Sequence, residues 1–228
     1  SRYWIAESYY RNDQYQQARE LYTELYNQSA LYRQPESYLI PYNIAYCFYK
    51  EGDYDSAARW FGTYLDGSVT DLRKDALERV GDCHFVRKDY KAAAETYDIV
   101  VRDFYNVNDI YPYYQAALSY GLSRNGERKI KLLTNALSAD PAARFYPEAL
   151  YELGRAYVLR EDDAKAEGVF HQLASTAKDT TFVAKAYIEL GSLSRNQSQF
   201  NEALGYYKTV VEEMPLSGYA EDALAAIE

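Results

Sequence analysis

The chain has 228 residues, 48% of them hydrophobic, and its 34 acidic and 25 basic side chains leave a formal charge of −9. This excess of acid argues against a nucleic-acid-binding protein, whose contact surface is normally basic. No apolar run reaches the ~18 residues that a membrane-spanning helix needs. The apolar content is high enough to bury an extended core, which argues against disorder.

In chain order, the sequence repeats itself. A small residue recurs every 36 or 37 positions, at Ala45, Gly81, Ala117, Gly154 and Gly191. Twelve positions later most units have a second small residue, and four positions further comes a large apolar one: Phe61, Tyr97, Leu133, Phe170 and Tyr207. Self-similarity at this period predicts stacked repeats, each of them one supersecondary unit.

Each repeat is predicted to be a pair of antiparallel helices. In the fifth repeat, residues 147–160 carry small or apolar residues at the i, i+3, i+4, i+7 spacing of an amphipathic helix. A short turn at 161–163 leads to a second helix with Ala166 and Phe170 on one face. No alternating strand pattern competes with this one, so the sequence predicts an all-α fold, an α-solenoid of about six repeats.

The repeats are expected at residues 1–36, 37–72, 73–108, 109–145, 146–182 and 183–216, with the first helix of a further repeat at 217–228. We expect them to form a single solenoid. A helical pattern is already under way at Ser1 and is still running at Glu228, so we interpret the chain as a piece of a larger protein. Open solenoid ends expose apolar faces. We therefore expect a monomer in which those ends could pair to form a dimer.

The fourth repeat departs from the pattern. Lys129 stands where the second small residue is expected, and Gly126 replaces an aromatic residue. A long side chain at a helix crossing should separate the two helices. The sequence therefore predicts an irregularity over residues 124–131.

These columns resemble the tetratricopeptide repeat. The match rests on Gly or Ala at the eighth position of the repeat, Ala at the twentieth, an aromatic residue at the twenty-fourth, and a proline at the thirty-second in Pro141 and Pro215. The spacing exceeds the family's usual ~34 residues, and the extra residues fall between units, as at 175–181. The resemblance implies a right-handed superhelix of antiparallel helix pairs that binds other proteins.

Three segments also resemble the large repeat proteins of Gram-negative bacterial envelopes: residues 42–54, 79–86 and 214–220. In those relatives the stack faces the periplasm and scaffolds partner proteins. The likeness implies a periplasmic or outer-membrane-associated location, with the cytoplasm as the alternative.

The family geometry also implies which side chains line the concave groove of the stack. The expected groove residues are Tyr10, Tyr42, Tyr46, Tyr49, Asp82, Phe85, Tyr111, Tyr114, Tyr151, Arg155 and Arg195. Most are tyrosines, whose rings and hydroxyls suit a peptide or a partner helix. Two interpretations remain open, because the same rings could instead pack against one another and the neighbouring repeat. Lys185, Ser192 and Arg195 make the sixth segment basic and polar.

No set of residues points to catalysis, a cofactor or a metal. His84 and His171 lie in separate repeats without ligands at metal-binding spacing. Cys47 and Cys83 occupy one column of adjacent repeats, too far apart for a disulfide, and are expected to be buried thiols. The chain is therefore predicted to be a protein-binding scaffold and not an enzyme. A structural spacer or assembly domain is the alternative, and a carbohydrate-binding module is a third reading, since tyrosine rings also stack on sugars.

Overall fold

The computed structural model describes residues 2–28, 35–67 and 71–227, and every regular element within these ranges is helical. The prediction of an all-α fold is confirmed. The chain forms two compact units, residues 1–105 and 106–228. Each unit is described by itself.

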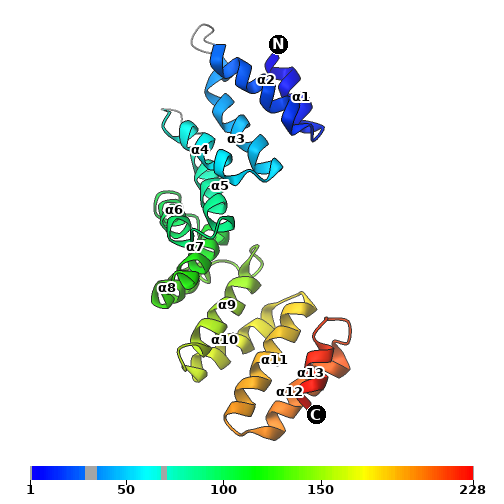
Figure 1. Cartoon of the computed structure of the whole chain (residues 1–228). Helices are drawn as coiled ribbons and strands as arrows, with labels where there is room; N and C mark the ends of the chain where they lie inside the picture. The colour runs from blue at the N-terminus through cyan, green and yellow to red at the C-terminus, as the bar shows by residue number, and fades with distance from the viewer. Residues whose placement is uncertain (1, 29–34, 68–70, 228) are drawn as a thin grey trace. The chain divides into compact units, whose positions relative to one another are not determined.

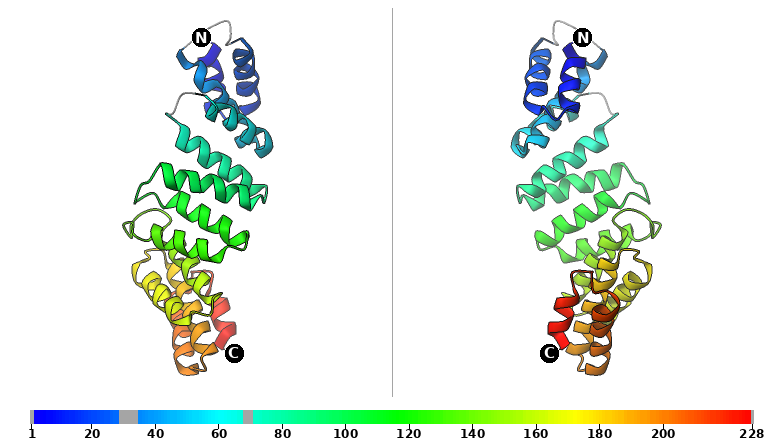
Figure 2. Two further views of the ribbon diagram at one scale, coloured as in Figure 1. Left: turned by 90° about the vertical axis from the view of Figure 1, so that its left-hand side faces the viewer. Right: turned by 90° about the vertical axis from the view of Figure 1, so that its right-hand side faces the viewer.

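Within the described part of the first unit the helices are α1 (Arg2–Arg11), α2 (Tyr15–Gln28), the 3-10 helix η1 (Pro35–Leu39), α3 (Ile40–Glu51), α4 (Tyr54–Leu65), α5 (Arg73–Val86) and α6 (Tyr90–Asp103). Consecutive α-helices pack against each other, and the two helices of each pair run antiparallel (Figure 1; Figure 2). The first unit is thus a stack of helix pairs, as expected for a solenoid.

The described part of the second unit contains α7 (Ile110–Leu122), α8 (Gly126–Ala136), α9 (Tyr146–Val158), α10 (Asp163–Thr176), α11 (Thr180–Asn196), α12 (Phe200–Glu213) and α13 (Ala220–Ile227). Its helices stack in the same way (Figure 1). Helix α11 begins at Thr180, so the link after α10 is shorter than the loop expected at 175–181. Asp179 caps this helix by accepting a hydrogen bond from the Thr181 backbone N–H at 2.8 Å.

One turn geometry joins the two helices of every pair. A residue with left-handed backbone ends the first helix: Asp13, Gly52, Lys88, Arg124, Glu161 and Ser198, with φ between 58° and 82°. The next residue donates its N–H to a carbonyl five positions back, as in Asp53 to Phe48 at 2.9 Å. At four of the turns the side chain of that residue then caps the second helix, from Asp53, Asp89, Asn125 and Asp162. Short polar side chains at this position therefore end one helix and start the next.

The small-residue column allows close helix crossings. A Cβ placed on Gly154 of α9 would lie 2.5 Å from Cε1 of Phe170 on α10. Gly191 meets the ring of Tyr207 in the same way. Contacts this short leave no room for a methyl group, so glycine is required where the ring of the second helix lies on the backbone of the first.

Lys129 is accommodated by a glycine. Its Cδ lies 2.9 Å from the place where a Cβ of Gly121 would be, so the stem of the lysine occupies space that any other residue at 121 would fill. The turn before it keeps the shared geometry, with Arg124 in the left-handed region and Asn125 capping α8. The turn itself is therefore regular, and the wider separation of α7 and α8 expected over residues 124–131 stays a prediction.

Candidate functional site

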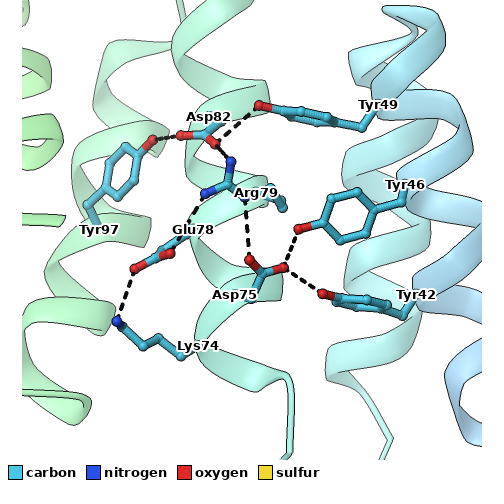
Figure 3. A network of polar contacts seen from close by, with 9 residues as sticks. All are labelled: Tyr42, Tyr46, Tyr49, Lys74, Asp75, Glu78, Arg79, Asp82 and Tyr97. Carbon is cyan, nitrogen blue, oxygen red and sulfur yellow. Dashed lines mark hydrogen bonds and ion pairs between the residues drawn. The ribbon is translucent and has the colours of Figure 1, made fainter. Parts of the chain in front are cut away.

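The tyrosines of α3 that were expected to line a groove point toward acidic residues of α5 (Figure 3). The hydroxyls of Tyr42 and Tyr46 both donate to Oδ2 of Asp75, at 2.7 and 2.5 Å, and their ring centroids lie 4.9 Å apart (Figure 3). Asp75 keeps 38% of its side chain exposed. One carboxylate at the surface thus orients two tyrosine rings of the preceding helix pair.

A second carboxylate, Asp82, lies deeper in the same network. It is 7% exposed, accepts from Tyr49 at 3.3 Å and from Tyr97, and forms an ion pair with Arg79 at 2.5 Å (Figure 3). These partners come from α3, α5 and α6, so the buried charge is compensated from three helices. The sequence placed Asp82 on the groove surface, but its burial means that it supports the network and is not available to a partner.

The α3 tyrosines of this network, and Tyr10 of α1, resist ionisation. Burial, and then the hydrogen bond to Asp75, raises the pKa of Tyr46, and the same two causes raise that of Tyr42. Burial raises the pKa of Tyr49 and of Tyr10 to about 12. All four rings therefore stay neutral near pH 7, with their hydroxyls able to donate.

A cleft of about 280 Å³ lies beside these rings, lined by Glu7, Tyr10, Tyr22, Tyr42, Asn43 and Tyr46. Glu7 of α1 accepts from the buried Tyr22 hydroxyl at 2.8 Å and from exposed Arg11 at 3.1 Å. Asn43 donates to the Tyr3 hydroxyl at 3.0 Å. The cleft therefore combines aromatic faces with one carboxylate and one amide.

Phe85 is the remaining expected groove residue of the first unit. It is partly buried at the end of α5, with its ring centroid 5.4 Å from that of Tyr90. It lies outside the cleft and the acidic network.

In the second unit, two expected groove tyrosines pack on a loop residue. The rings of Tyr111 and Tyr114 on α7 lie 5.4 and 5.8 Å from that of Phe145, which precedes α9 with φ of 69°. Burial raises the pKa of Tyr114 to about 12. Both residues are partly buried and keep part of their surface exposed.

Tyr151 of α9 repeats the pattern of a tyrosine bonded to an acid of the next pair. Its hydroxyl donates to Glu189 of α11 at 3.0 Å, and the Lys185 ammonium lies 5.1 Å from its ring centroid. Arg155 is exposed, 5.9 Å from the same ring and 4.0 Å from Glu189. Arg195 is exposed near the end of α11, and the contacts of Tyr151 do not include it.

Two of the acids that accept from the expected groove tyrosines, Asp75 and Glu189, were not among the residues expected from the sequence. Asp75 stands on a column that the family geometry places in the groove, whereas Glu189 lies off those columns. Their sequence distances from their tyrosines differ, at 33 and 38 residues. Because no single spacing joins these tyrosines to their acids, the repeat period would not have found them.

The candidates for chemistry are dispersed. Cys47 and Cys83 are free and buried, as predicted. His84 lies 3.9 Å from Asp89, whereas exposed His171 lies near Tyr206. Within the described ranges no three of His, Cys, Asp and Glu gather in a way that could hold a metal ion. None of the helices seen there combines the length and apolarity that crossing a bilayer requires.

Two family models for the tetratricopeptide repeat match the sequence, over residues 3–69 and 149–184. No curated protein matches it.

Several solved structures share the fold. The C-terminal part of a TPR repeat-containing protein from Cytophaga hutchinsonii is 18% identical, with 99% of this chain and 93% of that one covered at a TM-score of 0.72. MamA from Desulfovibrio magneticus is 21% identical, with 75% of this chain and 90% of that one covered at a TM-score of 0.62. YrrB, described as a TPR protein with an unusual peptide-binding site, is 15% identical. The alignment covers 86% of this chain and 96% of that one at a TM-score of 0.65. At these identities the likeness shows the fold.

Proposed function

Since this chain is a tetratricopeptide-repeat protein, we propose that it binds a peptide segment or a helix of a partner protein on the tyrosine-rich faces of its first helices. The observation that carries the proposal is the cleft beside Tyr10, Tyr42 and Tyr46. Asp75 orients two of these rings through hydrogen bonds. Rings held in place before binding lose little entropy when a partner arrives, which favours recognition.

The proposed contact residues differ between the units. In the first unit they are Tyr10, Tyr42, Tyr46, Tyr49 and Phe85. Asp82 orients Tyr49 by accepting a hydrogen bond from its hydroxyl. In the second unit they are Tyr111, Tyr114, Tyr151, Arg155 and Arg195. Tyrosine and arginine are the residue types that dominate binding energy at protein interfaces. A binding role without catalysis is part of the proposal, and so is the envelope location that the resemblance implies.

The test is selection of peptides from a random library displayed on phage, followed by affinity measurements on the selected peptides. Replacing Tyr10 and Tyr114 with alanine should weaken binding at least about tenfold, because each removes a ring proposed as an anchor. Tyr105→Ala is the matched control, since Tyr105 is 71% exposed and lies outside both sets. Circular dichroism and thermal melting establish that each variant folds.

Equal affinity of folded Tyr10→Ala, Tyr114→Ala and wild-type protein would reject the proposed surface. Loss of affinity in the Tyr105→Ala control would do so as well.

A spacer or assembly role is the second candidate. It is favoured by the hydroxyls of Tyr42, Tyr46, Tyr49 and Tyr151, all of which donate within the chain. On this alternative the tyrosines join consecutive helix pairs, no peptide is selected from the library, and the same substitutions lower stability only.

A further inference from the structure

The cleft of the first unit is bounded by three helices. Glu7 and Tyr10 come from α1, Tyr22 from α2, and Tyr42, Asn43 and Tyr46 from α3. Its volume of about 280 Å³ lies just below the range of pockets that enclose a whole small-molecule ligand, ~300–1,000 Å³. The space suits one long side chain of a bound peptide.

The charged side chain that lines this cleft is acidic. Among the described residues, Glu7 is the one carboxylate in the lining, and no lysine, arginine or histidine of the described ranges lines it. Asp75, which is not a lining residue, accepts hydrogen bonds from the hydroxyls of Tyr42 and Tyr46 and lies 3.9 Å from Arg79. Arg11 of the same helix as Glu7 pairs with Glu7 at 3.1 Å and is 71% exposed, and an ion pair with so exposed a partner is weak enough for a ligand to share the carboxylate.

The rings also offer their faces to a cation. Electron-rich tyrosine faces attract ammonium and guanidinium groups within ~6 Å of the ring centroid. Elsewhere the protein already uses this contact: the Lys185 ammonium lies 5.1 Å from the Tyr151 centroid while Glu189 accepts the Tyr151 hydroxyl. Tyr42 and Tyr46 have the same carboxylate-bonded hydroxyls, yet among the described residues no cation lies over them or over Tyr10.

We propose that this cleft receives a basic side chain, arginine or lysine, of the peptide that the protein binds. The inference rests on the proposed function and adds the chemical class of the partner segment. The cationic head group lies against the faces of Tyr10, Tyr42 and Tyr46 and pairs with the Glu7 carboxylate, while the Asn43 amide borders the head group.

The test follows tyrosine ring resonances by NMR while Nα-acetyl-arginine amide or Nα-acetyl-lysine amide is added. The neutral isostere Nα-acetyl-citrulline amide is the control ligand. We expect saturable shifts at Tyr10, Tyr42 and Tyr46 with the two cations and none with citrulline. Added salt should weaken the binding, because the contact is electrostatic.

Two variants isolate the cleft. Glu7→Gln keeps an acceptor for the Tyr22 hydroxyl and should weaken arginine binding about tenfold. Tyr10→Leu keeps an apolar side chain but removes the aromatic ring, and should also weaken arginine binding. Glu20→Gln makes the same charge change on exposed α2 outside the cleft and should stay within about twofold of wild type.

Equal shifts with arginine and citrulline overturn the inference, and so do equal affinities of Glu7→Gln and Glu20→Gln. If the phage-selected peptides lack basic residues and bind wild type and Glu7→Gln alike, the inference fails while the proposed function stands. If no peptide is selected but arginine amide saturates the cleft, the cation site stands and the proposed function fails.

Discussion

Tyr46 on α3 and Asp75 on α5 are joined by a hydrogen bond of 2.5 Å across 29 residues of sequence. The bond connects the first helices of two consecutive pairs (Figure 3). Tyr42 donates to the same oxygen at 2.7 Å. The tyrosine-rich face is therefore also part of the contact between repeats, so binding and stability depend on shared residues.

Replacing Tyr46 with phenylalanine should lower the free energy of unfolding by about 1 kcal/mol. The ring remains, but Asp75 loses one of its two tyrosine donors. Urea denaturation measures the change, and a double-mutant cycle with Asp75→Asn should show coupling between the two positions. Additive effects would mean that the bond contributes nothing. Tyr105→Phe, on an exposed ring, serves as the control.

Two glycines of one helix pair should respond to alanine in opposite directions. Gly154→Ala places a methyl group 2.5 Å from the Phe170 ring and should destabilise the protein by about 1–3 kcal/mol. Gly168 lies inside α10 with no atom within 4 Å of its Cβ position, so Gly168→Ala should stabilise by about 0.5–1 kcal/mol. Thermal melting of both variants checks the prediction. The same sign for both would contradict the packing described.

Lys129→Ala restores the residue that the repeat pattern favours, yet it should destabilise the protein by about 1–2 kcal/mol. The alanine leaves empty space beside Gly121, and Glu152 of α9 loses a partner held at 2.6 Å. Lys129 and Glu152 are only 12% and 21% exposed, so solvent replaces the ion pair poorly. Lys131→Ala, on the exposed face of α8, is the control. A stabilising Lys129→Ala substitution would show that the repeat pattern outweighs this local contact.

Stability should fall as the pH rises from about 10 to 12. Burial raises the pKa of Tyr10, Tyr49, Tyr114 and Tyr151 to about 12, whereas tyrosine in an unfolded chain titrates near ~10. The unfolded state loses these protons first, so the contribution is complete below pH ~10 and is lost as the pH passes the folded values. Tyrosinate absorbance in native and urea-unfolded protein tests this. Coincident titration curves would refute it.

Both thiols should react slowly in the native state. Cys47 and Cys83 are free and fully buried, and burial raises the pKa of each to about 12, which suppresses the reactive thiolate. A thiol-reactive chromophore should modify both only on unfolding, at the rate of that process. Rapid modification of either cysteine without loss of helical signal would contradict the burial.

The all-α fold and the tetratricopeptide repeats could be predicted from the sequence alone. The signals are local, because a helix pair with its turn fits within one repeat of 36–37 residues. The spacing in sequence between Gly154 and Phe170 is the same as that between Gly191 and Tyr207, because the same helix crossing forms in each pair. Asp53 and Asp89 likewise mark the same turn.

Contacts between pairs were decided only by the tertiary structure. Tyr46 and Asp75, like Lys129 and Glu152, meet through side-chain directions and helix stacking, so their sequence distances follow no common period. For the same reason neither the burial of Asp82 nor the contact between Lys129 and Gly121 could be predicted from the sequence. Which hydroxyl meets which acid depends on how neighbouring repeats pack, and that is a property of the assembled stack.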